Sequence, residues 1–132
     1  MFEIKISPRF SETDALGHIS NTALPIWFEA GRQDVFTIFT PNLEIETWPL
    51  ILARFEVDFL AQTYYGKDVL IKTGIARLGN SSLNVYQEAW QNQTRVAKGL
   101  TTLVHFDYQQ QKATLITDKQ REQLNAHVFT GE

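Results

Sequence analysis

Apolar side chains recur every three or four residues between residues 24 and 39, and this spacing predicts one long helix. Asn21 and Thr22 are its candidate N-caps, because their side-chain oxygens can accept from the free N–H groups of the first turn. Pro25 falls in that first turn, where a missing N–H costs little. Ile26 and Phe36 leave the helix apolar around most of its circumference, so we expect other elements to wrap around it. The apolar face comprises Leu24, Trp27, Phe28, Gly31, Val35, Ile38 and Phe39.

The rest of the chain alternates apolar and polar positions with a period of two, which predicts β-strands. The first strand is expected between Phe2 and Phe10, ended by Pro8 and the loop beyond it. An amphipathic tail follows the last strand, with Asp118 as its expected N-cap. In the strand that begins at Leu50, one face is expected to carry Ile51, Ala53, Phe55, Val57 and Phe59. Further strands are expected from Val69 to Leu78, from Leu83 to Trp90, from Val96 to Phe106 and, shorter, from Ala113 to Ile116.

The order of these elements predicts an α+β fold in a single domain, residues 1–132. A strand and a long helix are followed by four or five strands joined by short turns, and strands joined in this way pair antiparallel. No linker is long enough to divide the chain. One curled antiparallel sheet around one central helix is the simplest way to bury both apolar surfaces.

Composition excludes several classes of function. The 132 residues include no cysteine, so there is no disulfide, no thiol nucleophile and no thiolate metal site. The formal net charge of -3 and the lack of a basic stripe argue against nucleic-acid binding. His105 and His127 share no ligand spacing with His18, so no metal site is expected. No apolar run reaches about 18 residues and the first residues lack a signal-peptide layout, so we expect no membrane span and a cytoplasmic location.

Several motifs stand out along the chain: Arg9-Phe10, Thr13-Asp14, Gly17-His18, Asn21, Trp27-Phe28-Glu29-x-x-Arg32, Tyr65-Gly66-Lys67-Asp68-Val69, Asn80-Ser81-Ser82-Leu83, Ala97-x-Gly99 and Val104-x-Phe106-Asp107. Together they resemble the motifs of the 4-hydroxybenzoyl-CoA thioesterase branch of the hotdog-fold superfamily. The resemblance implies a hotdog fold, a homodimer whose two sheets join edge to edge, and often a homotetramer. It also implies active sites at the dimer interface that hydrolyse an acyl-CoA thioester, with CoA present only as part of the substrate and no separate cofactor.

A thioester carbonyl needs a group that attacks it and a group that holds the negative charge formed on its oxygen. A helix N-terminus supplies the second, because its free N–H groups and its dipole favour anions. In the family that the chain resembles, the aspartate at Asp14 acts as nucleophile or as general base for water, and the backbone N–H near Asn21 polarises the carbonyl. The residues alone also allow Asp14 to be a turn residue that caps Gly17 and His18.

The other polar residues near the helix start each have two interpretations. His18 could hydrogen-bond the substrate or orient Asp14, or it could be structural. The Asn21 side chain fits a helix cap better than a catalytic group. Glu29 is a rival carboxylate, since another hotdog branch places its catalytic acid on this helix. The alternative for Glu29 is a pair with Arg32 or Gln33.

These observations predict an acyl-CoA thioesterase that uses Asp14, Asn21 and His18. One alternative in the same fold is a thioesterase that acts on an acyl-carrier protein. Another, from a different class, is a non-catalytic hotdog protein that binds acyl-CoA. A dehydratase is less favoured, because the aspartate-histidine motif of those relatives is not found.

Overall fold

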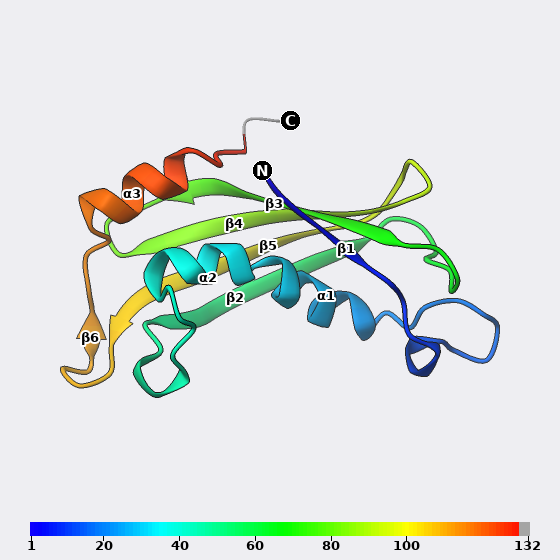
Figure 1. Cartoon of the computed structure of the whole chain (residues 1–132), viewed down its shortest axis with the longest axis horizontal. Helices are drawn as coiled ribbons and strands as arrows, with labels where there is room; N and C mark the ends of the chain where they lie inside the picture. The colour runs from blue at the N-terminus through cyan, green and yellow to red at the C-terminus, as the bar shows by residue number, and fades with distance from the viewer. Residues whose placement is uncertain (130–132) are drawn as a thin grey trace.

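The computed structural model describes residues 1–129, and in it a curled antiparallel sheet wraps one face of a layer of helices (Figure 1). The strand order is β1-β3-β4-β5-β2, and β6 pairs with β5. This arrangement confirms the expected α+β hotdog fold. β1 stops before Pro8, and β6 is shorter than the strand expected from Ala113 to Ile116. The strands are β1 (Phe2–Ile6), β2 (Leu50–Phe59), β3 (Val69–Leu78), β4 (Ser82–Gln91), β5 (Thr94–Asp107) and β6 (Lys112–Ala113).

Two helices, α1 and α2, follow one another across the concave face of the sheet, and α3 packs against α2 and β3 (Figure 1). Within residues 1–129, none of the helices is long and apolar enough to cross a membrane. The helices are α1 (Ala23–Gly31), α2 (Gln33–Phe39) and α3 (Asp118–Asn125), with short 3-10 helices at Phe10–Glu12 and Ile45–Thr47.

The single long helix that the sequence predicts is interrupted at Arg32, so α1 and α2 are separate helices. The backbone continues in the same direction, since the Arg32 N–H donates to the Phe28 carbonyl and the Arg32 carbonyl accepts from Phe36. At this point Thr73 Oγ1 donates to the Gly31 carbonyl at 3.2 Å. A side chain that binds a helix carbonyl in this way competes with the regular ladder of helix hydrogen bonds. The sheet therefore accounts for the interruption, which the periodicity of the helix could not reveal.

The helix caps agree only in part with those expected. Thr22 is the N-cap of α1, but its side chain makes no capping bond. Ser20 Oγ instead accepts from the Thr22 N–H at 3.3 Å. The expectation that Asp118 caps the last helix is wrong. Thr117 is the N-cap of α3, in a capping box with Gln120, and Asp118 is the first helical residue.

A β-bulge in β2 changes which side chains face the core. The pairing of β2 with β5 shifts register between Leu52 and Arg54, so Ala53 is an extra residue. Because such an insertion reverses the alternation of side chains, Leu52 lies on the same face as Phe55. Leu52 lines a cavity under the helices, and Phe55 packs against the core. The expectation that Ile51 shares a face with Phe55 is therefore wrong.

The core forms two clusters beneath the helices. The cluster under α1 centres on Trp27 and Phe28, which pack against β3, β4 and β5. The cluster under α2 and α3 centres on Val35 and Leu124. Between them, at Gly31, the helix backbone closely approaches the sheet. A Cβ atom at Gly31 would lie 2.6 Å from Ile71 Cγ2 and 2.9 Å from Gln87 Nε2.

Glu12 anchors the loop before α1 to the helix itself. Glu12 Oε2 accepts from Trp27 Nε1 at 2.8 Å, and Glu12 Oε1 accepts from the Arg9 N–H at 2.7 Å. Burial raises the pKa of the Glu12 carboxyl, but the hydrogen bonds from Arg9 and Trp27 and the charge of Arg9 outweigh it. The pKa of Glu12 therefore lies below its ordinary value of 4.5.

We predict that Gly31→Ala destabilises the protein by roughly 1–3 kcal/mol, because the added methyl group overpacks the contact with Ile71. An exposed helical glycine would behave in the opposite way, since alanine there stabilises by about 0.5–1 kcal/mol. The free energy of unfolding is measured in urea by circular dichroism. Ala30→Gly, at the exposed neighbouring position, serves as a control. It should lower the free energy of unfolding only by the amount by which a helix favours alanine over glycine. A more stable Gly31→Ala protein would contradict the close approach.

We predict that Glu12→Gln lowers the free energy of unfolding at pH 7 by about 1–2 kcal/mol, because glutamine has only one acceptor for the two donors. A carboxyl whose pKa is lower in the folded chain stabilises fully above its unfolded pKa, near 4.5 for Glu12. That contribution to stability disappears as the pH falls through the lowered pKa of the folded protein. Urea unfolding across this range should therefore show the two proteins converging as the pH drops below 4.5. A difference that is independent of pH would count against a charged Glu12.

Candidate functional site

The loop between residues 12 and 22 folds back on itself and leads directly into α1. The Asp14 N–H donates to the His18 carbonyl at 2.8 Å, and the Ser20 N–H donates to the Glu12 carbonyl at 2.8 Å. Gly17 takes a φ of 83°, a left-handed conformation that glycine adopts without strain. The structure thus brings Asp14 and His18 together at the tip of a small hairpin.

The Asp14 carboxylate has one oxygen in the turn and one directed toward His18. Asp14 Oδ1 accepts from the Leu16 N–H at 2.7 Å and from the His18 N–H at 3.1 Å. Asp14 Oδ2 lies 3.6 Å from His18 Nδ1, and 43% of the Asp14 side chain is exposed. The contacts of Oδ1 are those of the turn residue considered in the sequence analysis. Oδ2 accepts no hydrogen bond from residues 1–129.

The hairpin rests on the segment between β2 and β3. The Ile19 N–H donates to the Thr63 carbonyl at 2.7 Å, and the His18 ring lies edge-on to Tyr64 with centroids 5.2 Å apart. Gln91 is buried and holds this segment in place. Its side chain accepts from the Tyr64 N–H at 2.9 Å and donates to the Tyr64 carbonyl at 2.8 Å. A buried amide on β4 therefore supports the loop that carries Asp14 and His18.

Asn21 lies at the junction of this loop and α1. Its side chain is exposed and is not the helix cap that the sequence suggested. The next two N–H groups, of Thr22 and Ala23, both donate to Ser20. Within residues 1–129, the Asn21 N–H has no acceptor. It is therefore a free donor beside the positive end of the α1 dipole.

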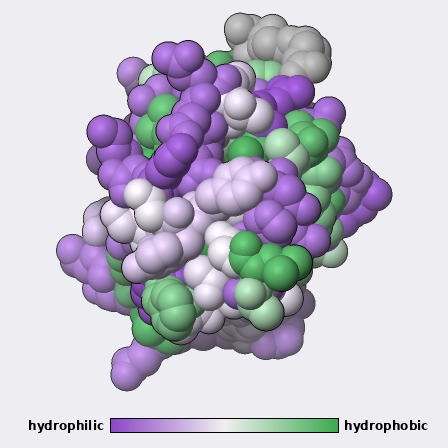
Figure 2. Space-filling view, turned by 90° about the vertical axis from the view of Figure 1, so that its right-hand side faces the viewer, coloured by the Kyte–Doolittle hydropathy of each residue, from purple (hydrophilic) through white to green (hydrophobic). Residues whose placement is uncertain are grey.

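Exposed apolar side chains surround this end of the molecule. Figure 2 faces it and shows hydrophobic groups separated by hydrophilic ones. Near the loop, Phe10 and Leu16 are largely exposed, and Tyr65 lies edge-on to Phe10 with ring centroids 5.9 Å apart. Such side chains offer an apolar surface to a ligand or to another protein chain.

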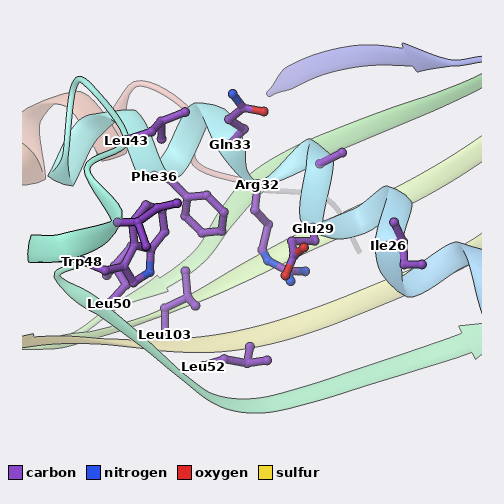
Figure 3. Close-up of a pocket in the computed structure, with 12 residues that line it drawn as sticks. Ile26, Glu29, Arg32, Gln33, Phe36, Leu43, Trp48, Leu50, Leu52 and Leu103 are labelled. Carbon is purple, nitrogen blue, oxygen red and sulfur yellow. The ribbon is translucent and has the colours of Figure 1, made fainter.

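A cavity of about 730 Å³ lies beside α1 and α2, between these helices and β2 (Figure 3). Glu29 and Arg32 are its charged residues. The part of the chain that is described contains no direct ion pair between Glu29 and Arg32, which is one of the two contacts considered for Glu29. The lining residues are Ile26, Glu29, Ala30, Arg32, Gln33, Phe36, Leu43, Ile45, Trp48, Leu50, Leu52 and Leu103.

Arg32 belongs to a buried polar network that the sequence analysis did not identify. Its Nη1 donates to Gln87 Oε1 and to Thr101 Oγ1, both at 3.2 Å. Gln87 Nε2 in turn donates to the Phe28 carbonyl at 2.8 Å. The sequence did contain a sign of this network, because Gln87 lies among apolar residues on one face of β4. A buried amide on such a face requires a partner.

No group of three histidine, aspartate or glutamate side chains among residues 1–129 could hold a metal ion. The polar groups that the structure does bring together fall in two places. Asp14, His18 and the Asn21 N–H lie around the start of α1, while Glu29 and Arg32 lie further along the helices in the cavity.

Comparison with known proteins identifies relatives of the whole fold. A family model for the thioesterase-like superfamily matches residues 8–124. A structure described as a predicted thioesterase from Bacillus stearothermophilus is 45% identical, with 99% of this chain and 98% of that chain covered and a TM-score of 0.95. The uncharacterized protein YsmA of Bacillus subtilis (strain 168) is 28% identical over 121 residues, which are 91% of this chain and 82% of YsmA.

A further similar structure was solved with bound ligands. It is a thioesterase from Thermus thermophilus complexed with coenzyme A and Zn, and it is 28% identical to this chain. The match covers 92% of this chain and 95% of that chain, with a TM-score of 0.82. Since the family model spans most of the sequence and the fold agrees, the chain belongs to the thioesterase-like superfamily and is a hotdog-fold thioester hydrolase.

Proposed function

We propose that the protein hydrolyses an acyl-CoA thioester to a carboxylic acid and CoA, with Asp14 as base or nucleophile. One observation carries this proposal. The hairpin that holds the Asp14 carboxylate against His18 leads straight to the Asn21 N–H, a free donor at the start of α1. The Thermus thermophilus relative supports CoA as the carrier, because it was solved with coenzyme A bound.

In the general-base form of the reaction, Asp14 Oδ2 takes a proton from water while the water oxygen attacks the thioester carbon. The carbonyl electrons move to oxygen, where the Asn21 N–H and the α1 dipole stabilise the negative charge. Collapse of this intermediate expels the CoA thiolate, which takes up the proton. In the nucleophilic form, Asp14 itself attacks, CoA leaves, and water then hydrolyses the mixed anhydride. In both forms His18 orients the carboxylate through its Nδ1 atom.

Two alternatives share this fold. The acyl group could be carried by an acyl-carrier protein, or the protein could bind acyl-CoA without cleaving it. Offering the same acyl group on CoA and on carrier protein separates the first alternative from the proposal. Tight binding of acyl-CoA without turnover, unchanged by Asp14→Ala, would select the second.

We further propose that the protein assembles as a homodimer, or as a homotetramer of two dimers. In support, β2 forms one edge of the sheet over ten residues. Leu52 is 53% exposed and Phe59 is 46% exposed on this strand. A long edge strand with exposed apolar side chains is usually covered by another chain or element.

We predict that Asp14→Asn lowers kcat by about 10²- to 10⁴-fold, because the amide can neither take a proton nor attack. The amide oxygen can still accept from Leu16 and His18, so the turn is preserved. Turnover is measured with a panel of acyl-CoAs and a thiol-detecting dye. Asp118→Asn, at an exposed position on α3, is the matched control and should retain full activity. Full activity of Asp14→Asn would eliminate this mechanism.

We predict that sedimentation analysis at micromolar concentration finds dimers or tetramers, because assembly covers the edge of β2. Charged substitutions of both Leu52 and Phe59 should shift the distribution toward the monomer. A monomer at every concentration of the unmodified protein would show that β2 is not an interface between copies.

A further inference from the structure

Arg32 is an unusual residue at the floor of the cavity, because it is buried and charged but has only neutral partners. It is 3% exposed. Its Nη1 binds the side-chain oxygens of Gln87 and Thr101, which carry no charge. Arginine is almost never buried in this way unless it is paired with an anion. The site thus holds an excess positive charge in largely apolar surroundings.

One edge of the Arg32 guanidinium remains unused. Nε is fully buried and has no hydrogen-bond partner. Nη2, which lies on the same edge, donates to no acceptor within residues 1–129. Because Nε is enclosed by protein atoms, Nη2 is the donor of this edge that a ligand can reach. An arginine N–H binds a carboxylate more strongly than a neutral acceptor, so a carboxylate is the group that Nη2 favours.

The remainder of the cavity is suited to an aliphatic chain. Phe36, Trp48, Leu50 and Leu103 line it, and at about 730 Å³ it falls in the size range of small-molecule sites. Figure 3 shows Arg32 extending from the helices toward the sheet, with these apolar side chains to one side of it. An occupant that satisfies both features has a carboxylate joined to an apolar body.

Glu29 is the charged group nearest to this site. It is exposed at the rim of the cavity. Burial lowers the pKa of Arg32, and the negative charge of Glu29 partly opposes that effect. Because Glu29 faces solvent, its charge is screened and neutralises Arg32 only weakly.

We propose that this cavity binds an aliphatic carboxylate, with the carboxylate on Nη2 of Arg32 and the chain against the apolar wall. None of the residues that line it belongs to the Asp14 loop of the same chain. The ligand is either a free carboxylic acid or an acyl group that ends in a carboxylate. Both present the same chemistry to Arg32.

The test measures binding by calorimetry, with decanoate and decanol as probes that differ only in the charged end. We expect decanoate to bind about 10- to 100-fold more tightly than decanol, the range for hydrogen bonds to a charged group. Quenching of Trp48 fluorescence, absent in Trp48→Phe, would locate the ligand in the cavity. Equal affinity for the two probes, or no binding because a second copy fills the cavity, would overturn the proposal. Since no turnover is involved, failure of the proposed hydrolysis would leave this result unaffected.

Two variants sharpen the test. Arg32→Met should reduce decanoate affinity to that of decanol. Because this buried residue also supports the fold, Glu29→Gln provides a second measurement at an exposed position. Glu29→Gln removes a carboxylate that competes with the ligand for the charge of Arg32. Decanoate binding should therefore tighten about two- to fivefold, while decanol binding stays unchanged. An unchanged decanoate affinity in a folded Arg32→Met protein would refute the role of Arg32.

Turnover distinguishes the two sources of the carboxylate. Faster hydrolysis of a CoA thioester of decanedioic acid than of decanoyl-CoA, lost in Arg32→Met, would assign the carboxylate to the acyl group. Equal hydrolysis of the two thioesters, with decanoate binding retained, would assign it to a free acid. Either result supports the cavity as a carboxylate site.

Discussion

The close contact between the Gly31–Arg32 turn and the concave sheet is the constraint on which the rest of the structure depends. Gly31 has no side chain, so the helix backbone approaches close enough for Thr73 to bind its carbonyl. The same approach places Arg32 against Gln87 and Thr101. One turn of helix therefore divides α1 from α2, creates a buried polar network, and fixes the height of both helices above the sheet.

The position of α1 then determines where its N-terminus lies. The loop before it is held from two sides, by Glu12 through Trp27 and by Gln91 through the Tyr64 segment. These contacts leave little freedom to the hairpin of Asp14. A carboxylate and a free N–H can act on one carbonyl only if both are held in place, because misplacement by about 1 Å can cost a hundredfold in rate. Rigidity around this loop is thus a requirement of the chemistry that we propose.

The cavity and the loop lie along the same pair of helices but differ in character. The loop is exposed and polar, and its groups suit a reaction in contact with water. The cavity is mostly apolar, with one buried cation at its floor. It lies next to β2, the edge at which we propose that two copies meet, so assembly would affect access to Arg32.

The α+β layout, the helical face from Leu24 to Val35 and most strand limits to within two residues could be predicted from the sequence, because these follow from local periodicity. The sequence also placed Asp14 and His18 in one loop. Only the tertiary structure decided the break at Arg32, the face of Ile51 and the partners of Gln87. Each of these depends on contacts between residues far apart in the chain: a bulge set by pairing with β5, or a side chain that reaches another element. Local patterns carry no information about such contacts, since the same alternation fits either face of a sheet.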